Sequence, residues 1–417
     1  MYDISNIKKK MLTRDNVIYL IKKYKTPIWV YNADIIIKQI KKLEKFDIIR
    51  FAQKSCSNIH ILKLMKQYNI KIDAVSLGEI KRAILAGFQP NNNDIVFTSD
   101  ILEEKVLQEV IQKKIPVNAG SIDMLKQIGK KSPGHPVWIR INPRFGNGHH
   151  IKTNTGGDTS KHGIWNPIKA LSIINQYKLN LIGLHMHIGS GVNTENLYQV
   201  CESMKKNAIQ LNQKIKFISA GGGLKIPYSS KDTETDLEDY FNKWNNTKKI
   251  ISSTLKCPLK LEIEPGRFLV GQSGILISKV YAVKNMGKNT FVLINSGFND
   301  LIRPTLYGSY HKITVIYNSI KNTKNTPIIK SIIAGPLCES GDVFTIKKTG
   351  IIFPRNLPKV KPGDYLIIHD TGAYGSSMSS NYNSRPFIPE VLYKNGKFKL
   401  IRRRQTIQEM LSLETSL

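Results

Sequence analysis

Residues 48–75 read IIRFAQKSCSNIHILKLMKQYNIKIDAV, in which two β-branched runs flank a stretch of helical character. Short, continuous apolar runs are typical of strands buried on both faces of a parallel sheet. The intervening apolar residues recur at the three- and four-residue spacing of a helix packed on one face. The segment therefore predicts a strand at 48–52, a helix at 58–68 and a strand at 72–75.

The same alternation continues as far as Glu264. Six more strand-like runs follow, at 95–98, 116–119, 137–141, 181–187, 216–220 and 259–264. The stretches between the runs have helical periodicity, for example 77–86, 102–113 and 195–213. Only 143–165 is long, rich in glycine and without periodicity, which is typical of a functional loop. Eight strand–helix units are the number that closes a TIM barrel, so we predict a (β/α)8 barrel over 31–272.

The pattern changes beyond residue 265. Strand-like runs at 280–283, 291–294, 328–333, 365–369 and 397–401 are separated by Gly, Pro and Asn clusters, with little helical periodicity. This predicts a C-terminal all-β barrel domain over 273–417. The segment 1–30 ends in a predicted strand preceded by a helix, and we expect it to pack with the β domain.

The chain is strongly basic, with 62 Lys and Arg against 31 Asp and Glu and a net charge of +31. A nucleic-acid footprint is clustered, whereas these lysines are scattered along the whole length. The densest cluster, 402–404, is not accompanied by a recognisable DNA- or RNA-binding motif. We therefore expect solvated faces and no nucleic-acid partner.

The four cysteines are far apart in the sequence and form no C-x-x-C pair. This predicts neither a disulfide framework nor a metal site. Residues 1–10 lack the apolar core of a signal peptide, and no apolar stretch approaches the roughly 20 residues of a membrane helix. We expect a cytoplasmic protein without a membrane partner.

Reactive residues collect where the predicted strands end, which is where a TIM barrel has its active site. Lys54 follows the first strand. A lysine that is desolvated in the barrel mouth is a nucleophile toward an aldehyde. A lysine at the end of a strand is, however, more often simply solvated. Glycines 221–223 follow the seventh strand, where backbone N–H groups can approach a phosphate, although a Gly-Gly-Gly run is more often only a turn.

Two further side chains point into the predicted barrel. His187 lies two residues after His185 on a predicted strand, so both side chains would face the interior. Stacking on an aromatic cofactor and simple core packing are equally compatible with His187. A metal site formed by the two histidines is disfavoured, because no third ligand recurs at a fixed spacing. Glu264 ends the last strand, and a carboxylate buried there needs a cationic partner such as a protonated pyridine nitrogen.

Seven motifs, which together span nearly the whole chain, resemble the alanine-racemase-like, fold-type III pyridoxal-phosphate-dependent decarboxylases. They are FAQKSCSN (51–58), DAVSLGE (73–79), HMHIGSG (185–191), SAGGGL (219–224), EIEPGRF (262–268), GPLCESGD (335–342) and GAYGSSMSSNYNSRP (372–386). The opening FAQKSC departs from the tyrosine–alanine that much of the family has there, without touching a residue that has an implied role.

The resemblance implies pyridoxal 5'-phosphate as cofactor. Lys54 would hold it covalently, His187 would stack on its ring, and Glu264 would keep its ring nitrogen protonated. Asp73, Pro265 and Gly266 belong to the same implied cofactor-binding set. The residues implied around the phosphate are Ser190, Gly223, Arg267 and Tyr374.

The resemblance also implies a homodimer with shared active sites. Cys338 would reach across the dimer interface and protonate the carbanion left by loss of CO2. Arg303 favours a substrate with a second carboxylate, because guanidinium groups bind carboxylates bidentately. This favours meso-diaminopimelate, which would give L-lysine, the last step of its biosynthesis. The residues implied for substrate binding are Arg267, Arg303, Tyr307, Glu339 of the partner chain and Tyr374.

Three other functions remain open at this level. A decarboxylase of ornithine or arginine on the same fold would not need Arg303 for a distal carboxylate. A non-catalytic regulatory homologue is disfavoured because Lys54 and Cys338 are both present. A racemase or cofactor-homeostasis protein on the same barrel is disfavoured by the full β domain with its CESGD and RPTLY motifs.

Overall fold

The structure is a computed structural model that describes residues 4–148, 150–319, 326–347 and 349–415. The chain divides into two compact units. The barrel unit comprises 39–226 and 233–268, and the β-rich unit comprises 1–38, 227–232 and 269–417. The sequence-based boundaries, 1–30, 31–272 and 273–417, differ from this division by eight residues at the first boundary and four at the second, and omit the short 227–232 segment.

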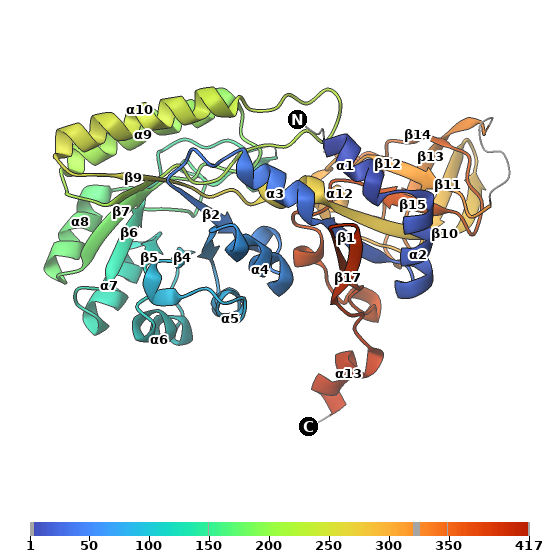
Figure 1. The fold of residues 1–417 in the computed structure, drawn as a ribbon, viewed down its shortest axis with the longest axis horizontal. Coiled ribbons are helices and arrows are strands. Elements are labelled where there is room, and N and C mark those ends of the chain that lie inside the picture. Colours follow the sequence, from blue (N-terminus) through green and yellow to red (C-terminus); the bar gives the residue numbers. More distant parts are fainter. Residues whose placement is uncertain (1–3, 149, 320–325, 348, 416–417) are drawn as a thin grey trace. The chain divides into compact units, whose positions relative to one another are not determined.

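The barrel unit contains a closed ring of eight parallel strands, which confirms the predicted (β/α)8 barrel (Figure 1). All eight predicted runs form strands, with ends that differ by at most two residues. The strands are β2 (Ile48–Ala52), β3 (Lys71–Ala74), β4 (Ile95–Ser99), β5 (Val117–Ala119), β6 (Pro136–Arg140), β7 (Asn180–His185), β8 (Phe217–Ser219) and β9 (Lys260–Ile263).

Helices follow the barrel strands and cover the outside of the ring (Figure 1). Side-chain caps begin several of them; Ser76 Oγ, for example, accepts a hydrogen bond from the Glu79 amide at 3.2 Å. The two longest, α9 and α10, pack side by side. The helices are α4 (Ile59–Gln67), α5 (Leu77–Leu85), α6 (Glu104–Gln112), α7 (Ile122–Lys131), α8 (Pro167–Gln176), α9 (Thr194–Leu211) and α10 (Leu237–Leu255).

Side chains fill the barrel interior. Trp138 of β6 stacks on Phe217 of β8 with ring centroids 5.4 Å apart. Arg50 of β2 forms an ion pair with Glu262 of β9, with Nε and Nη2 each 2.9 Å from a carboxylate oxygen, and neither side chain is exposed. The barrel is therefore a packed core, and room for chemistry remains at the ends of the strands.

The β-rich unit is built on a nine-stranded mixed sheet with a few short helices, which confirms a second, β-rich domain. The N-terminal strand β1 pairs antiparallel with β10 and parallel with β16. Five of the nine strands had been predicted within this domain, and β12, β14 and β16 had not. The strands are β1 (Ile28–Asn32), β10 (Gly274–Met286), β11 (Asn289–Ile294), β12 (Ile313–Ile316), β13 (Ile328–Ala334), β14 (Arg355–Pro358), β15 (Tyr365–Ile368), β16 (Glu390–Lys394) and β17 (Lys397–Arg402).

An apolar core between α2 and this sheet explains why the N-terminal segment folds with the C-terminal strands. It joins Leu20, Val30, Ile277, Ile367 and Val391, all at most 1% exposed. The helices of this unit are α1 (Ile4–Met11), α2 (Arg14–Tyr24), α12 (Arg303–Tyr307) and α13 (Ile407–Thr415). Two more helices, α3 (Ala33–Lys41) and α11 (Arg267–Val270), lie where the chain passes from one unit to the other.

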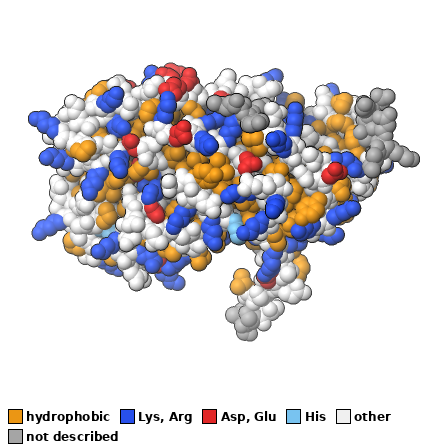
Figure 2. Space-filling model, in the orientation of Figure 1, with side chains coloured by type: hydrophobic (Ala, Val, Ile, Leu, Met, Phe, Trp, Pro, Cys, Tyr) orange, Lys and Arg blue, Asp and Glu red, His pale blue; other side chains and the backbone are white. Residues whose placement is uncertain are grey.

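The basic side chains are spread over the surface. Figure 2 shows Lys and Arg scattered across the whole visible face, without a single dense patch. In the described part of the chain, no helix combines the length and the apolar character that crossing a membrane requires.

Candidate active site

Lys54 lies in the single turn η1 (Gln53–Ser55), directly after β2. The Ala52 amide donates a hydrogen bond to the Pro265 carbonyl oxygen at 3.3 Å, and a Cβ on Gly266 would lie 3.3 Å from the Ala52 carbonyl oxygen. The turn bearing Lys54 therefore packs against the segment that follows β9. The Lys54 side chain is exposed, so the predicted desolvation is wrong. The strand β2 ends at Ala52, as expected, and the side chain on the turn beyond it reaches solvent.

Glu264 directly follows β9 and is only 8% exposed. Its Oε2 lies 2.7 Å from His185 Nε2, and its Oε1 accepts a hydrogen bond from Ser219 Oγ at 3.0 Å. Burial by itself raises the pKa of Glu264, but the charge and hydrogen bond of His185, together with Arg50, outweigh it and lower the pKa. Glu264 is thus an ionised carboxylate inside the barrel mouth, suited to a cationic ring nitrogen.

Two more carboxylates lie near Lys54. Burial and the negative charge of Glu264 raise the pKa of Asp73, although Lys54 opposes this effect. Burial raises the pKa of Glu79 to about 7, against a hydrogen bond that its carboxylate accepts from the Val75 amide at 2.8 Å. Glu264 therefore differs from these acidic neighbours, because its pKa is lowered whereas the pKa values of Asp73 and Glu79 are raised.

His187 lies beyond the end of β7, which stops at His185. The predicted strand 181–187 ended two residues too late, so the two histidines do not share a strand face. Burial, followed by the positive charges of Lys54 and Arg140, lowers the pKa of His187 well below its usual range, so the ring is neutral. A Cβ on Gly222 would lie 3.5 Å from His187 Cε1, which places the ring beside the glycine run.

Glycines 221–223 follow β8, as predicted, and the chain bends at Gly222. Gly223 has a φ of 113°, a conformation that favours glycine, and its carbonyl oxygen accepts hydrogen bonds from the amides of Gly191 and Val192. The Arg267 guanidinium, itself 6% exposed, donates from Nη2 to Ser190 Oγ at 2.9 Å. A buried cation and a serine hydroxyl next to a glycine turn are suited to an anion such as a phosphate.

The barrel residues fit pyridoxal phosphate. The donor set offers an amine for an aldehyde, an ionised carboxylate for a ring nitrogen and a cation for a phosphate. Among the described side chains, buried Asp73 Oδ1 and His187 Nδ1 have no hydrogen-bond partner. Unsatisfied buried polar atoms are uncommon, and at this site they indicate positions that a ligand can satisfy.

The remaining predicted site residues belong to the β-rich unit. Arg303 and Tyr307 are the first and last residues of α12, and Arg303 is 1% exposed. Cys338 and Glu339 are exposed, in a loop that α12 contacts through a hydrogen bond from Thr305 Oγ1 to the carbonyl oxygen of Gly341 at 2.9 Å. Tyr374 has a φ of 57°, in the left-handed region that few non-glycine residues adopt.

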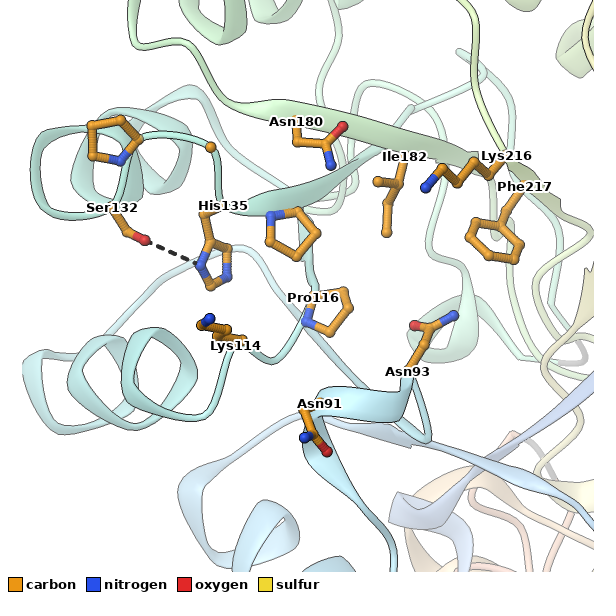
Figure 3. A pocket seen from close by; sticks show the side chains of 13 residues that line it. Asn91, Asn93, Lys114, Pro116, Ser132, His135, Asn180, Ile182, Lys216 and Phe217 are labelled. Atoms are coloured by element: carbon orange, nitrogen blue, oxygen red, sulfur yellow. Dashed lines mark hydrogen bonds between the residues drawn. The ribbon is translucent and has the colours of Figure 1, made fainter.

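A pocket of about 530 Å³ lies at the opposite, amino-terminal ends of β5–β8 (Figure 3). His135 of its lining is buried, with Nε2 2.9 Å from the Ile115 carbonyl oxygen. Lys114 and Lys216 also line it, and none of its described lining residues is acidic. None of the residues with a predicted role lies there, and barrel enzymes have their chemistry at the carboxyl ends of the strands, so this pocket is not the candidate active site.

Sequence reasoning missed the partners that tune the predicted residues. It did not assign Ser219 or His185 to Glu264, nor His311 to Arg303. Ser219 sits at the carboxyl end of a predicted strand in the motif SAGGGL, and that position was a usable signal. His311, whose Nε2 is 3.0 Å from Arg303 Nη1, had no comparable signal, because only the fold shows which nitrogen meets the guanidinium.

The chain matches, over residues 33–271, the family described as pyridoxal-dependent decarboxylase, pyridoxal binding domain. It is 60% identical over 414 residues to a diaminopimelate decarboxylase of Buchnera aphidicola subsp. Schizaphis graminum, covering 99% of this chain and 100% of the relative. It is 54% identical over 407 residues to that of Escherichia coli K12, covering 97% of each.

Solved structures are also similar to this chain. A crystal structure of diaminopimelate decarboxylase, 53% identical, has a TM-score of 0.95 and covers 99% of both chains. The diaminopimelate decarboxylase of Helicobacter pylori complexed with L-lysine is 31% identical, with a TM-score of 0.84 and coverage of 96% of this chain and 100% of that one.

Proposed function

The chain belongs to the pyridoxal-dependent decarboxylase family, and within it to the diaminopimelate decarboxylases; we propose that Lys54 attaches its cofactor and that Arg303 selects its substrate. The reaction is the decarboxylation of meso-2,6-diaminopimelate to L-lysine and CO2, the last step of lysine biosynthesis, with pyridoxal phosphate as cofactor. These residue roles rest on one observation: the ionised Glu264 directly precedes Pro265 and Gly266, which pack on the turn that bears Lys54.

Pyridoxal phosphate, when bound, supplies an electron sink for the carbanion that loss of CO2 leaves. Lys54 holds it covalently through its amine. Glu264 keeps a proton on the ring nitrogen, because its own pKa is lowered and its negative charge favours a cation beside it. Neutral His187 packs on the ring face.

The remaining cofactor contacts follow from position and charge. Asp73 lies on β3 and pairs in register with Ala52, two residues before Lys54. Pro265 and Gly266 form the segment that packs on the Lys54 turn. The phosphate is bound by Ser190, Gly223, Arg267 and Tyr374, where the glycine turn and the buried guanidinium support the assignment.

Arg303 binds the carboxylate of the substrate that is not lost, because its planar guanidinium matches a carboxylate bidentately. Its burial supports this role, since a shielded guanidinium binds an anion more strongly than a solvated one. Cys338 donates the proton that replaces CO2. The other substrate-binding residues in this proposal are Tyr307, Arg267, Glu339 and Tyr374.

The active enzyme is proposed to be a homodimer in which Cys338 and Glu339 serve the partner's site. Both side chains are exposed in the single chain, which supports a role at a subunit surface. Mixing inactive Lys54→Ala subunits with inactive Cys338→Ala subunits should restore activity, because a mixed dimer contains one site with both residues intact. Mixed dimers that stay inactive would contradict a shared site. The homodimer is placed in the cytoplasm, in keeping with four free cysteines.

The function is tested by an absorbance spectrum of the purified protein with pyridoxal phosphate, before and after addition of meso-diaminopimelate, with L-lysine assayed in the same tube. Borohydride reduction and peptide mass spectrometry then locate the cofactor. We expect L-lysine release and a cofactor mass on the peptide that contains Lys54. A cofactor mass on another lysine would reject the Lys54 role, and consumption of ornithine or arginine alone would reject the role of Arg303.

A further inference from the structure

The guanidinium of Arg303 is held in one orientation by three side chains of the β-rich unit. Its Nη1 donates to His311 Nε2 at 3.0 Å and to Tyr228 Oη at 2.9 Å. Its Nη2 donates to Ser309 Oγ at 3.2 Å. Arg303 is 1% and His311 4% exposed, so water competes little for these hydrogen bonds.

The hydrogen bonds define the protonation of His311. Its Nδ1 lies 2.8 Å from the His369 carbonyl oxygen, which can only accept, so Nδ1 carries a hydrogen. A guanidinium can only donate, so His311 Nε2 must offer its lone pair to Arg303. His311 is therefore neutral, with its single ring hydrogen on Nδ1.

Tyr228 supports the same guanidinium from another side. Its ring meets His311 edge to face, with centroids 5.4 Å apart and planes at 82°. Arg303 Cζ lies 5.0 Å from the centre of the Tyr228 ring, within the range of a cation–π interaction. Tyr228 belongs to the short 227–232 segment that clusters with the β-rich unit.

We propose that His311 is a positioning residue, which orients Arg303 so that the enzyme prefers substrates and products bearing a carboxylate at the end distal to the reaction. This inference rests on the proposed role of Arg303. An arginine side chain has many rotamers, and ordering it on binding costs entropy. With Arg303 ordered in advance, a carboxylate meets a preformed, correctly oriented fork.

The test uses the full-length enzyme with bound pyridoxal phosphate and the variant His311→Ala. Loss of hydrogen bonds to a charged group predicts a KM for meso-diaminopimelate about 10- to 100-fold higher, with kcat nearly unchanged. The inhibition constant of L-lysine, which retains the distal carboxylate, should rise by a similar factor. That of 1,5-diaminopentane, which has no carboxylate, should not change.

Three variants separate positioning from general destabilisation. His311→Gln keeps an acceptor near the guanidinium and should restore most of the affinity. Tyr228→Phe removes one acceptor but keeps the ring, so its effect should be smaller than that of His311→Ala. His135→Ala removes a similarly buried histidine, which directly precedes β6 of the barrel unit, and its KM for meso-diaminopimelate should equal that of the wild type.

Arg303→Ala distinguishes failure of this inference from failure of the proposed function. If Arg303→Ala changes neither KM nor L-lysine inhibition, the role of Arg303 itself is wrong. If Arg303→Ala raises both values but His311→Ala raises neither, or lowers kcat alone, only the positioning role is overturned. Should His311→Ala not fold, His311→Phe replaces it, because phenylalanine keeps a ring but offers no acceptor to the guanidinium. An unchanged KM in His311→Phe would then overturn the positioning role.

Discussion

Glu262 and Glu264 are two residues apart at the end of β9, and both are buried, yet they lie in different layers of the barrel. Glu262 is paired through both carboxylate oxygens with Arg50, and neither side chain is exposed. Glu264 instead contacts His185 and a serine hydroxyl, and it lies beside the turn that bears Lys54. One glutamate completes a closed ion pair in the core, and the other faces the barrel mouth.

The same contrast appears on β2, where Arg50 lies in the lower layer and Lys54 in the turn beyond the strand. A buried charge matched by an opposite charge has its hydrogen bonds satisfied and little capacity left for a ligand, but it is costly to break. A carboxylate held by a histidine and a hydroxyl keeps lone pairs for a ligand. The partners of a buried charge, rather than its burial or its place on the strand, therefore separate structural charges from functional ones.

The largest effect is expected at Lys54. Lys54→Ala should abolish L-lysine formation, because no amine remains to hold the cofactor, while the free energy of unfolding should change by less than about 0.5 kcal/mol, as is usual for an exposed side chain. Activity and chemical denaturation measured on the same preparation check both parts. Lys63→Ala, an exposed lysine of α4, is the matched control and should retain full activity. A comparable loss in Lys63→Ala would contradict the assignment.

At Glu262, one layer below in the barrel, we expect the opposite result: a loss of stability with activity kept. Glu262→Gln leaves the Arg50 charge buried without its ionic partner, which should cost about 3–5 kcal/mol of folding free energy. Activity per folded molecule should be largely kept, because Glu262 has no part in the chemistry. Urea denaturation followed by tryptophan fluorescence measures the loss. The double variant Arg50→Met with Glu262→Leu should recover much of the stability, and a single variant that loses under about 1 kcal/mol would contradict the pair's structural role.

Much of this barrel could be predicted from the sequence, because each strand is a short β-branched run and each helix has its own periodicity. All eight barrel strands were expected, and the chemistry-bearing residues after β2, β8 and β9 were identified by position. The strands β12, β14 and β16 were missed, because short strands in a mixed sheet are fixed by pairing with distant segments rather than by local pattern.

Side-chain partners could not be predicted for the same physical reason. Tyr228 contacts Arg303 although 75 residues separate them in the chain, and His185 contacts Glu264 across 79 residues. The exposure of Lys54 was also not predictable, although β2 ends where expected, because it depends on the side chains that the fold places around the turn after the strand. Residue type and strand position indicated candidate roles, but the protonation states required the folded contacts.

Glu264→Gln should have a smaller effect than either change above. It removes the negative charge beside the ring nitrogen and keeps the side chain's shape, so kcat should fall about 100-fold, the order of one preorganised electrostatic contact. Steady-state kinetics at saturating cofactor measure it. Glu262→Gln, on β9 itself, is the matched control. An equal fall in kcat per folded molecule in both variants would contradict different roles for the two glutamates.

The same variant predicts a pH dependence of stability. The folded pKa of Glu264 is lowered below its unfolded value, so ionised Glu264 contributes stability that is present above the unfolded pKa and lost as pH falls through the folded pKa. The difference in unfolding free energy between wild type and Glu264→Gln should therefore be largest above about pH 5 and shrink below about pH 4. A difference that grows on acidification would contradict this sign.

The smallest effect is expected from Ser219→Ala, which tests whether the environment of Glu264 is tuned by more than His185. Ser219 Oγ donates to Glu264 Oε1 at 3.0 Å and accepts from the Gly221 amide at 3.1 Å, so its loss should cost about 1 kcal/mol and lower kcat by about 5-fold. Ser273→Ala is the control, because Ser273 is similarly buried but its hydroxyl donates to the Val270 carbonyl oxygen rather than to Glu264, and it should lose stability without losing kcat. If both serines lower kcat equally, the effect comes from general destabilisation. If only Ser219 does, the hydroxyl helps to hold Glu264 toward the barrel mouth, and the functional layer includes a residue that carries no charge at all.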